Sequence, residues 1–157
     1  MSRICLFPGT FDPITLGHVD IVNRSVSLFD KLFIGIGKNA NKQPMFSDEQ
    51  RYEWVKEIFA ADARIEVVMY EGLTVDCCRN IGAKYIVRGI RYVSDFEYEK
   101  VIADMNRSLD DSIETVFLTC LPEYTSVAST LVRDVIRHGG DASPFLPEPV
   151  KKSIFKK

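Results

Sequence analysis

Apolar positions follow two periods along this chain. Short continuous runs rich in Val, Ile and Phe predict buried strands, whereas apolar residues spaced three or four apart predict one face of a helix. The predicted strands cover residues 4–7, 31–37, 65–70, 84–88 and 115–120. The predicted helices cover residues 19–29, 47–59, 73–81, 94–107 and 129–138. Strands and helices therefore alternate along the chain.

This alternation indicates an α/β fold. Val- and Ile-rich strands separated by helices are typical of a parallel sheet, and we expect a Rossmann-like, five-stranded parallel sheet with helices on both faces. With 157 residues and no repeat or linker, residues 1–157 are expected to form a single domain. Ligands of such sheets bind outside the carboxyl ends of the strands, where the strand order reverses. The residues that follow the predicted strands are therefore candidates for a functional site.

Local signals place three helix starts. Ser47 with Gln50 and Ser94 with Glu97 have the spacing of capping boxes, in which the two residues bond each other's backbone N–H groups. One of the two hydroxyl residues at positions 129–130 is expected to cap the last main helix. These caps predict where three of the loops end.

The composition mainly excludes classes of protein and kinds of site. A net charge of −2 argues against a protein built for bulk nucleic-acid binding, which needs a broad basic surface. The first residues lack a signal-peptide pattern and no apolar run is long enough to cross a bilayer, so we expect a cytoplasmic protein with no membrane or nucleic-acid partner. The four cysteines lack the C-x-x-C spacing of a zinc or redox motif, which favours small buried side chains over a metal held by protein ligands.

The junction between the first strand and the first helix carries the strongest chemical signal. Gly9, Thr10, Gly17 and His18 lie there, and backbone N–H groups at a helix start favour phosphate. His18 can donate a hydrogen bond to an anionic oxygen. The alternative is a tight turn whose histidine only caps the helix.

Arginines follow the fourth strand. Arg88 ends an apolar strand, where an unpaired charge is costly, so it is expected to meet either an anionic ligand or a buried carboxylate. Arg91 has the same two interpretations, with neither favoured. The acidic run at residues 95–99 can hold ribose hydroxyls or face water.

Two further loops complete this edge of the predicted sheet. Lys38 and Lys42 follow the second strand, where a lysine is either solvated or part of the site. Residues 124–130 form a second hydroxyl-rich helix start, which can cradle phosphates or act only as a cap. Together, the cations, the histidine and two helix starts favour a polyphosphate ligand such as a nucleoside triphosphate. The chain has neither the G-x-x-x-x-G-K-[ST] loop of P-loop enzymes nor a G-x-G-x-x-G after the first strand.

The sequence resembles a known superfamily at these same positions. Thr15-Leu16-Gly17-His18 is similar to the T-x-G-H signature of nucleotidyltransferases, and within that superfamily the whole chain resembles the bacterial phosphopantetheine adenylyltransferases. The supporting segments are residues 8–13 (PGTFDP), Lys42 with 44–46 (PMF), 88–91 (RGIR), 95–99 (DFEYE), 105–107 (MNR) and 145–147 (FLP).

The resemblance implies an enzyme that reversibly transfers AMP from ATP to 4′-phosphopantetheine. The products are dephospho-coenzyme A and pyrophosphate, the reaction is the penultimate step of coenzyme A synthesis, and no covalent enzyme intermediate forms. The resemblance also implies Mg²⁺ bridging the phosphates, with no dedicated protein site, a homohexamer, and feedback inhibition by coenzyme A.

The resemblance assigns roles to individual residues as well. His18 would stabilise charge on the α-phosphate, with Lys42 and Arg91 completing the catalytic set. The acceptor would be held by Thr10, Lys42, Thr74 and Arg88, with Thr74 along the pantetheine arm. Contacts to ATP would come from Thr10, Phe11, His18, Gly89, Ile90, Arg91, Glu99, Tyr124, Thr125, Ser126, Val127, Ala128, Ser129 and Thr130.

The chain departs from the family pattern at two positions. Ala128 stands where a serine is common, so only backbone contacts are expected there, and Tyr124 stands where tryptophan is common.

Two rival functions stay open. One is a related enzyme that uses nicotinamide mononucleotide or glycerol phosphate as acceptor, and the other is a non-catalytic ATP-binding sensor.

Overall fold

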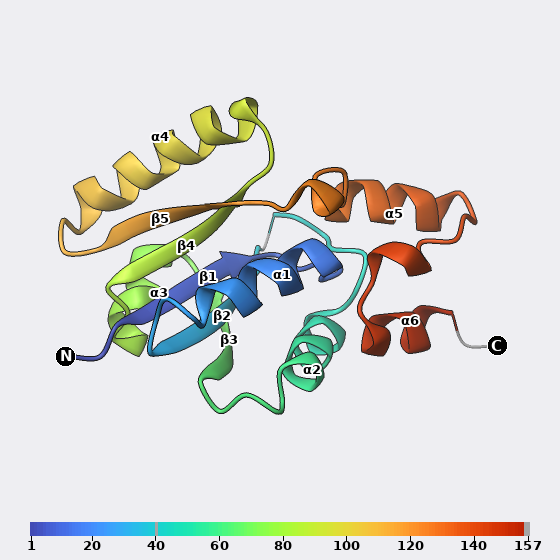
Figure 1. Cartoon of the computed structure of the whole chain (residues 1–157), viewed down its shortest axis with the longest axis horizontal. Coiled ribbons are helices and arrows are strands. Elements are labelled where there is room, and N and C mark those ends of the chain that lie inside the picture. Colours follow the sequence, from blue (N-terminus) through green and yellow to red (C-terminus); the bar gives the residue numbers. More distant parts are fainter. Residues whose placement is uncertain (40, 156–157) are drawn as a thin grey trace.

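Five parallel strands form the centre of the molecule (Figure 1). The computed structural model describes residues 1–39 and 41–155. The strands are β1 (Ile4–Gly9), β2 (Lys31–Lys38), β3 (Ile65–Glu71), β4 (Tyr85–Ile90) and β5 (Glu114–Thr119). The α-helices are α1 (Leu16–Ser25), α2 (Asp48–Ile58), α3 (Thr74–Ile81), α4 (Val93–Leu109), α5 (Ser129–Arg137) and α6 (Glu148–Ile154). The predicted strands are thus confirmed, with boundaries that differ by at most two residues.

The strand order places the expected ligand edge beside β1. The order is β3-β2-β1-β4-β5, so the chain first winds outward from β1 and then returns to its other side. β1 pairs with β2 as far as Gly9, but its pairing with β4 in the described chain covers only Cys5–Tyr85 and Leu6–Ile86. β1 and β4 therefore separate toward their carboxyl ends, and this is where the strand order reverses.

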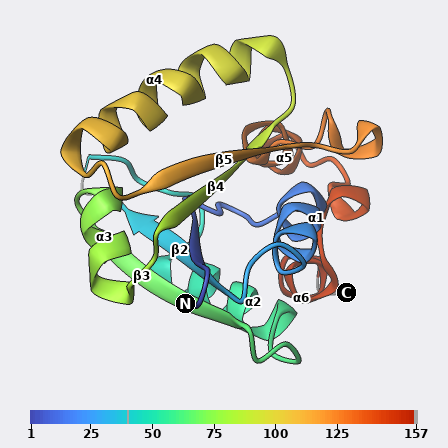
Figure 2. The same ribbon diagram turned by 60° about the vertical axis from the view of Figure 1, so that its left-hand side comes forward.

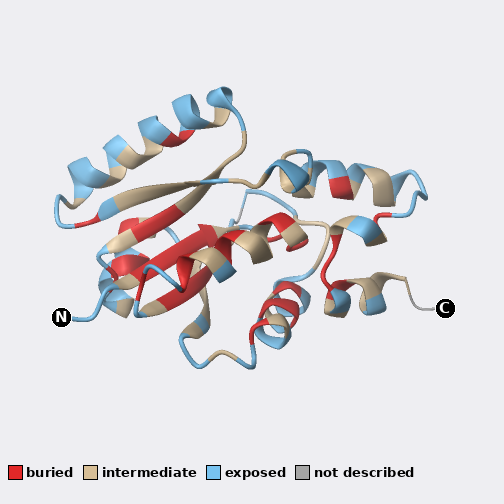
Figure 3. Cartoon of the chain, viewed as in Figure 1, coloured by how far each residue is buried: buried red, intermediate tan, exposed pale blue. Residues whose placement is uncertain are grey.

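Helices cover both faces of the sheet, as expected. Side chains alternate along β1, so Cys5 and Phe7 join a large core with α1, α2, α5 and α6, while Leu6 joins a smaller core with α3. Figure 2 shows α3 on one side of the strands and α1 and α6 on the other. Buried residues concentrate on the strands and the inner helix faces, whereas α4 is largely exposed (Figure 3).

One of the two predicted capping boxes is confirmed. The Ser47 hydroxyl accepts the Gln50 N–H, and the Gln50 side chain accepts the Ser47 N–H, at the start of α2. The box predicted for Ser94 with Glu97 is wrong, because α4 begins one residue before Ser94. Asp95 caps this helix instead, since its carboxylate accepts two backbone N–H groups of the preceding turn at 3.0 and 3.1 Å.

The cap predicted for α5 is also wrong. The N-cap position is Ala128, and neither of the hydroxyl residues that follow caps the helix. The Ser129 hydroxyl donates instead to the Pro13 carbonyl, 2.8 Å away. This bond ties the start of α5 to the loop after β1.

Candidate active site

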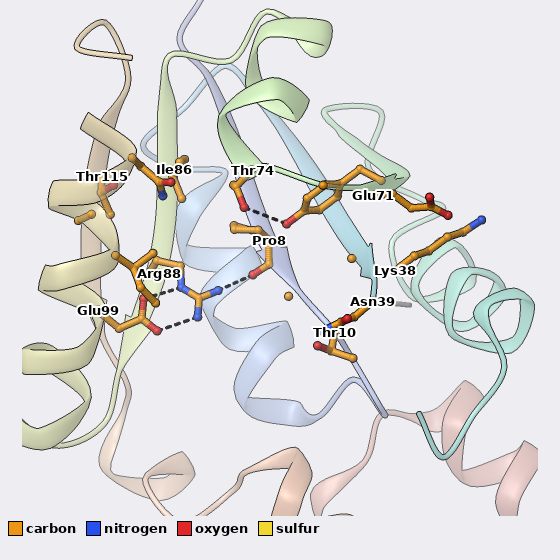
Figure 4. A pocket seen from close by; sticks show the side chains of 17 residues that line it. Pro8, Thr10, Lys38, Asn39, Glu71, Thr74, Ile86, Arg88, Glu99 and Thr115 are labelled. Carbon is orange, nitrogen blue, oxygen red and sulfur yellow. Dashed lines mark hydrogen bonds and ion pairs between the residues drawn. The ribbon is translucent and has the colours of Figure 1, made fainter. Parts of the chain in front are cut away.

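Two cavities meet where β1 and β4 separate. The α3–α4 cavity, of about 620 Å³, extends from this point toward Tyr70 and Thr74 and along α4 (Figure 4). The α1–α5 cavity, of about 480 Å³, extends the other way toward His18 and the start of α5. Both cavities are lined by Pro8, Gly9, Thr10, Arg88 and Glu99. A molecule in one cavity can therefore reach a molecule in the other.

His18 lies in the first turn of α1, which begins three residues earlier than predicted. Thr15 is the N-cap, and its backbone N–H donates to His18 Nδ1 at 3.0 Å. Because Nδ1 accepts this bond, the neutral ring carries its proton on Nε2. The two interpretations of His18, as a helix cap and as a donor to a ligand, are compatible with each other. The ring caps the helix through Nδ1 and keeps an Nε2–H donor for the α1–α5 cavity that it lines.

The surroundings of His18 keep it neutral. Burial, together with the nearby positive charges of Arg88 and Arg91, lowers the pKa of His18 to about 4. The Phe11 ring packs edge-on against the imidazole, with ring centroids 5.0 Å apart. At neutral pH the His18 ring is therefore uncharged and held in a fixed orientation, with its Nε2–H available as a donor.

Arg88 and Glu99 form an ion pair in the shared wall of the two cavities. Arg88 Nε and Nη2 donate to the two carboxylate oxygens of Glu99 at 2.8 and 2.7 Å, and Nη1 donates to the Pro8 carbonyl at 2.6 Å (Figure 4). Arg88 was expected to meet either an anionic ligand or a buried carboxylate, and in the structure it pairs with the buried carboxylate of Glu99. Three of the five guanidinium N–H groups are used in these bonds, which leaves two for a ligand.

Three arginines hold residues 8–12, a segment that runs from the end of β1 into the loop before α1. Each comes from a different element and donates to one backbone carbonyl of this segment. The bonds are Arg88 to Pro8 (2.6 Å), Arg51 to Thr10 (2.7 Å) and Arg133 to Asp12 (2.7 Å). Hydrogen bonds from charged donors are among the stronger ones in proteins, so the segment is held in position before any ligand binds.

Asp12 fixes the same segment to the loop before α2. Its buried carboxylate accepts the backbone N–H groups of Met45 and Phe46 at 2.8 and 2.9 Å. The preceding residue, Phe11, has a φ of 52°, in the left-handed region that non-glycine residues seldom adopt. The surrounding bonds stabilise this conformation, which places the Phe11 ring beside His18.

The predicted site residues divide between the two cavities. Thr74 lines the α3–α4 cavity, and Thr10, Arg88 and Glu99 line both. The α1–α5 cavity is also lined by Phe11, His18, Lys42, Gly89, Arg91, Val127, Ala128, Ser129 and Thr130. Within the described chain, Ile90, Tyr124, Thr125 and Ser126 lie outside both linings.

The loop before α5 lies next to the start of α1 at Gly17. A Cβ atom at Gly17 would lie 3.5 Å from the Val127 carbonyl oxygen and 3.7 Å from Tyr124 Cβ. These are ordinary contact distances, so the loop before α5 lies directly against the start of α1. Both helix starts consequently face the α1–α5 cavity, as the strand-end argument predicted.

Several residues of the site were missed by sequence reasoning. Arg51 is 1% exposed and Arg133 has a side chain only 15% exposed, yet both stand on helices where an arginine looks solvated. Tyr70 and Asn106 line the α3–α4 cavity, and Cys120, expected in a buried strand, is half-buried against the α1–α5 cavity. Only the strand-end rule could have pointed to Tyr70 and Cys120, because both follow or end strands.

Comparison with known proteins decides the family. The model of the cytidylyltransferase-like family matches residues 6–135. Phosphopantetheine adenylyltransferases from Flavobacterium psychrophilum and Phocaeicola vulgatus are each 50% identical to the chain over 149 residues, covering 95% of the chain and 98% of each relative. The relative of the same name from Ruegeria pomeroyi is 47% identical over 157 residues, covering 97% of the chain and 95% of the relative.

The chain belongs to the phosphopantetheine adenylyltransferase family. The resemblance, the α/β fold and the prediction of a nucleotidyltransferase enzyme are thereby confirmed. Family membership also gives the two joined cavities a chemical meaning, since a nucleotidyltransferase must bring two substrates together at one phosphorus atom.

Proposed function

We propose that the chain catalyses the reversible transfer of AMP from ATP to 4′-phosphopantetheine, forming dephospho-coenzyme A and pyrophosphate. The junction of the two cavities at Thr10 and Arg88 carries this proposal. On one side lies a compact cavity with His18, Arg91 and two helix starts, which suits a triphosphate. On the other side lies a cavity with a mixed polar and apolar wall, which suits an acceptor with a long arm.

The reaction needs position and charge rather than a general base. An oxygen of the acceptor phosphate attacks the α-phosphorus of ATP as the bond from that phosphorus to the pyrophosphate oxygen breaks. A phosphate monoester is largely a dianion at neutral pH, so no proton must be removed from it. This agrees with a His18 ring that is neutral and donates from Nε2 to an α-phosphate oxygen as charge develops there.

We assign the cations by their place around the junction. Lys42 lines the α1–α5 cavity near Thr10 and would hold the acceptor phosphate together with the free N–H groups of Arg88. Arg91 would contact the triphosphate, since its nearest carboxylate, Asp95, lies 3.7 Å away and leaves its fork available. Glu99 keeps Arg88 in place, and we propose this positioning role for it beside any contact with ATP.

Mg²⁺ is the expected cofactor, and the donor set fits an ion that arrives with the nucleotide. The carboxylates of the α1–α5 cavity already accept hydrogen bonds, Asp12 and Asp95 from backbone N–H groups and Glu99 from Arg88. Among the described residues, no group of three or more His, Cys, Asp or Glu side chains could hold a metal. Mg²⁺ bound to the phosphates would neutralise part of their charge. Lys42, Arg88 and Arg91 would then orient the phosphates themselves.

We also propose that copies of the chain assemble into a hexamer, as the family resemblance implies. The outer face of α4 supports assembly, because Val93, Val101, Met105 and Leu109 are between 48% and 79% exposed.

A cytoplasmic location agrees with four free cysteines. In the described residues, no helix is both long and apolar enough to span a bilayer. Inhibition by coenzyme A is proposed on the resemblance alone.

Pyrophosphate release tests the proposed reaction. The enzyme is given ATP and Mg²⁺ with 4′-phosphopantetheine, nicotinamide mononucleotide or glycerol phosphate in parallel. We expect release with 4′-phosphopantetheine alone. Release only with another acceptor would keep the fold and the chemistry but overturn the acceptor, and ATP binding without release from any acceptor would favour the sensor.

A further inference from the structure

The inner end of the α3–α4 cavity carries a pair of hydroxyl groups that the reaction itself does not use. Tyr70, near the end of β3, and Thr74, in the first turn of α3, both line this cavity. Tyr70 Oη and Thr74 Oγ1 lie 3.2 Å apart and share one hydrogen bond, marked by the dashed line at Thr74 in Figure 4. Both side chains are half-buried, so the pair is neither solvated surface nor sealed core.

Gly35 of β2 makes room for the tyrosine ring, and Gly37 lies beside the phenol at an ordinary contact distance. Gly37 is the register partner of Tyr70, and a Cβ atom there would lie 3.9 Å from Tyr70 Cζ and Oη. At Gly35 a Cβ atom would come within 3.1 Å of Tyr70 Cε1 and 2.8 Å of a Leu6 methyl group. The ring therefore packs over a strip of β2 that has no side chains, which fixes the direction of the phenol.

The hydroxyl pair has hydrogen-bonding capacity to spare. Two hydroxyl groups carry two protons, and their mutual bond uses one of them. Whichever group donates to the other, one O–H stays available for a ligand carbonyl and several lone pairs stay available for a ligand N–H. Burial raises the pKa of Tyr70, so the phenol keeps its proton at neutral pH.

The rest of the wall matches a ligand that alternates between apolar and amide groups. Ile86, Ile102 and Ala103 supply apolar surface in the same cavity, and Asn106 supplies an amide. The arm of 4′-phosphopantetheine has this alternation, because short carbon chains separate its two secondary amides. A secondary amide offers one donor and one acceptor, which the hydroxyl pair can meet together.

We propose that Tyr70 is a specificity-determining residue of the α3–α4 cavity. Tyr70 and Thr74 together bind an amide of the acceptor's arm. This inference rests on the proposed function. It predicts that the tyrosine hydroxyl affects binding of the acceptor and leaves ATP binding and the chemical step unchanged.

Tyr70→Phe tests the inference, since it removes only the hydroxyl and preserves the ring on its glycine strip. We expect the KM for 4′-phosphopantetheine to rise about three- to tenfold, the effect of one hydrogen bond, with kcat and the KM for ATP unchanged. Thr74→Val should give a similar rise, and the double variant should add little, because the two hydroxyls act as a unit. Tyr52→Phe is the matched control, since Tyr52 lies on α2 outside both linings and should leave the kinetics unchanged.

An acceptor without amides distinguishes a lost hydrogen bond to the amide from a change in the shape of the cavity. With an alkyl phosphate of similar length, wild type and Tyr70→Phe should have the same kcat/KM. An unchanged KM for 4′-phosphopantetheine would overturn the inference, as would an equal loss with the alkyl phosphate or a lower Tm as the only effect. If the wild type released pyrophosphate only with a different acceptor, the proposed function itself would fail, and the inference with it.

Discussion

The two cavities differ in how their polar groups are held. Around the α1–α5 cavity, two polar groups are held by the protein itself, since the neutral His18 ring accepts the Thr15 N–H and Arg88 is paired with Glu99. The inner end of the α3–α4 cavity instead offers a hydroxyl pair with bonding capacity left over. Donors and charges held in a fixed position suit a developing transition state, whereas spare hydrogen-bonding groups suit recognition of a ligand. Changes on the first side should therefore lower kcat, and changes on the second should raise KM.

The largest expected effect is that of His18→Ala. Loss of a transition-state donor should lower kcat by at least about a hundredfold, while ATP binding changes little. Single-turnover kinetics and ATP titration measure the two quantities separately. His138→Ala is the control, because that side chain is 77% exposed at the end of α5. If ATP affinity fell as much as kcat, His18 would bind the ground state of ATP rather than the transition state. The expected difference between the two cavities, an effect on kcat in one and on KM in the other, would then be wrong.

Lys42→Ala should have the next largest effect. Removing a charged donor to the acceptor phosphate should lower kcat/KM for the acceptor roughly 20-fold. Steady-state kinetics with varied acceptor measures the loss. Lys56→Ala serves as control, since Lys56 lies on α2 with its ammonium over the Tyr52 ring. An unchanged kcat/KM would place Lys42 outside the site.

Glu99→Gln tests whether the shared wall needs its ion pair. Gln keeps the shape but loses the charge, which leaves Arg88 partly unpaired in a half-buried place. We expect the free energy of unfolding to fall by about 2 kcal/mol and kcat to fall about tenfold, because the guanidinium is no longer held. Urea unfolding and steady-state kinetics measure the two effects. Glu97→Gln, on the exposed face of α4, should change neither, and equal effects of the two variants would contradict the positioning role.

The smallest expected effect is a dependence of stability on pH. The pKa of His18 is about 4 in the folded chain against an ordinary 6.5, so between these values the unfolded chain binds the proton and the folded chain does not. The free energy of unfolding should therefore rise with pH across this window through His18. Urea unfolding at pH 5 and pH 7.5 should show a larger difference for wild type than for His18→Gln. Equal differences would mean that His18 titrates normally in the folded chain.

The sequence predicted the scaffold and the edge of the sheet where the cavities lie. The alternation of strand and helix patterns predicted the parallel sheet, and the position of His18 after the first strand predicted that its side chain lies at the carboxyl edge of the sheet, where it lines the α1–α5 cavity. These predictions succeed because the hydrophobic period and the carboxyl-end rule depend on local pattern and topology alone.

The partners of the charged residues could not be predicted. The run at residues 95–99 holds three acidic side chains, and only the fold shows that Glu99 pairs with Arg88 while Asp95 caps α4. Arg51 and Arg133 donate to carbonyls 41 and 121 residues away, and a backbone carbonyl leaves no mark in a sequence. Buried polar contacts of this kind depend on three-dimensional distance rather than on period.

The three arginine bonds fix the spacing of residues 8–12, from the end of β1 into the following loop. Their acceptors are the carbonyls of residues 8, 10 and 12, spaced by two along the chain. One inserted or deleted residue in this segment would put the carbonyls out of step with at least one of the three guanidinium groups. The three bonds therefore constrain how many residues the segment can contain.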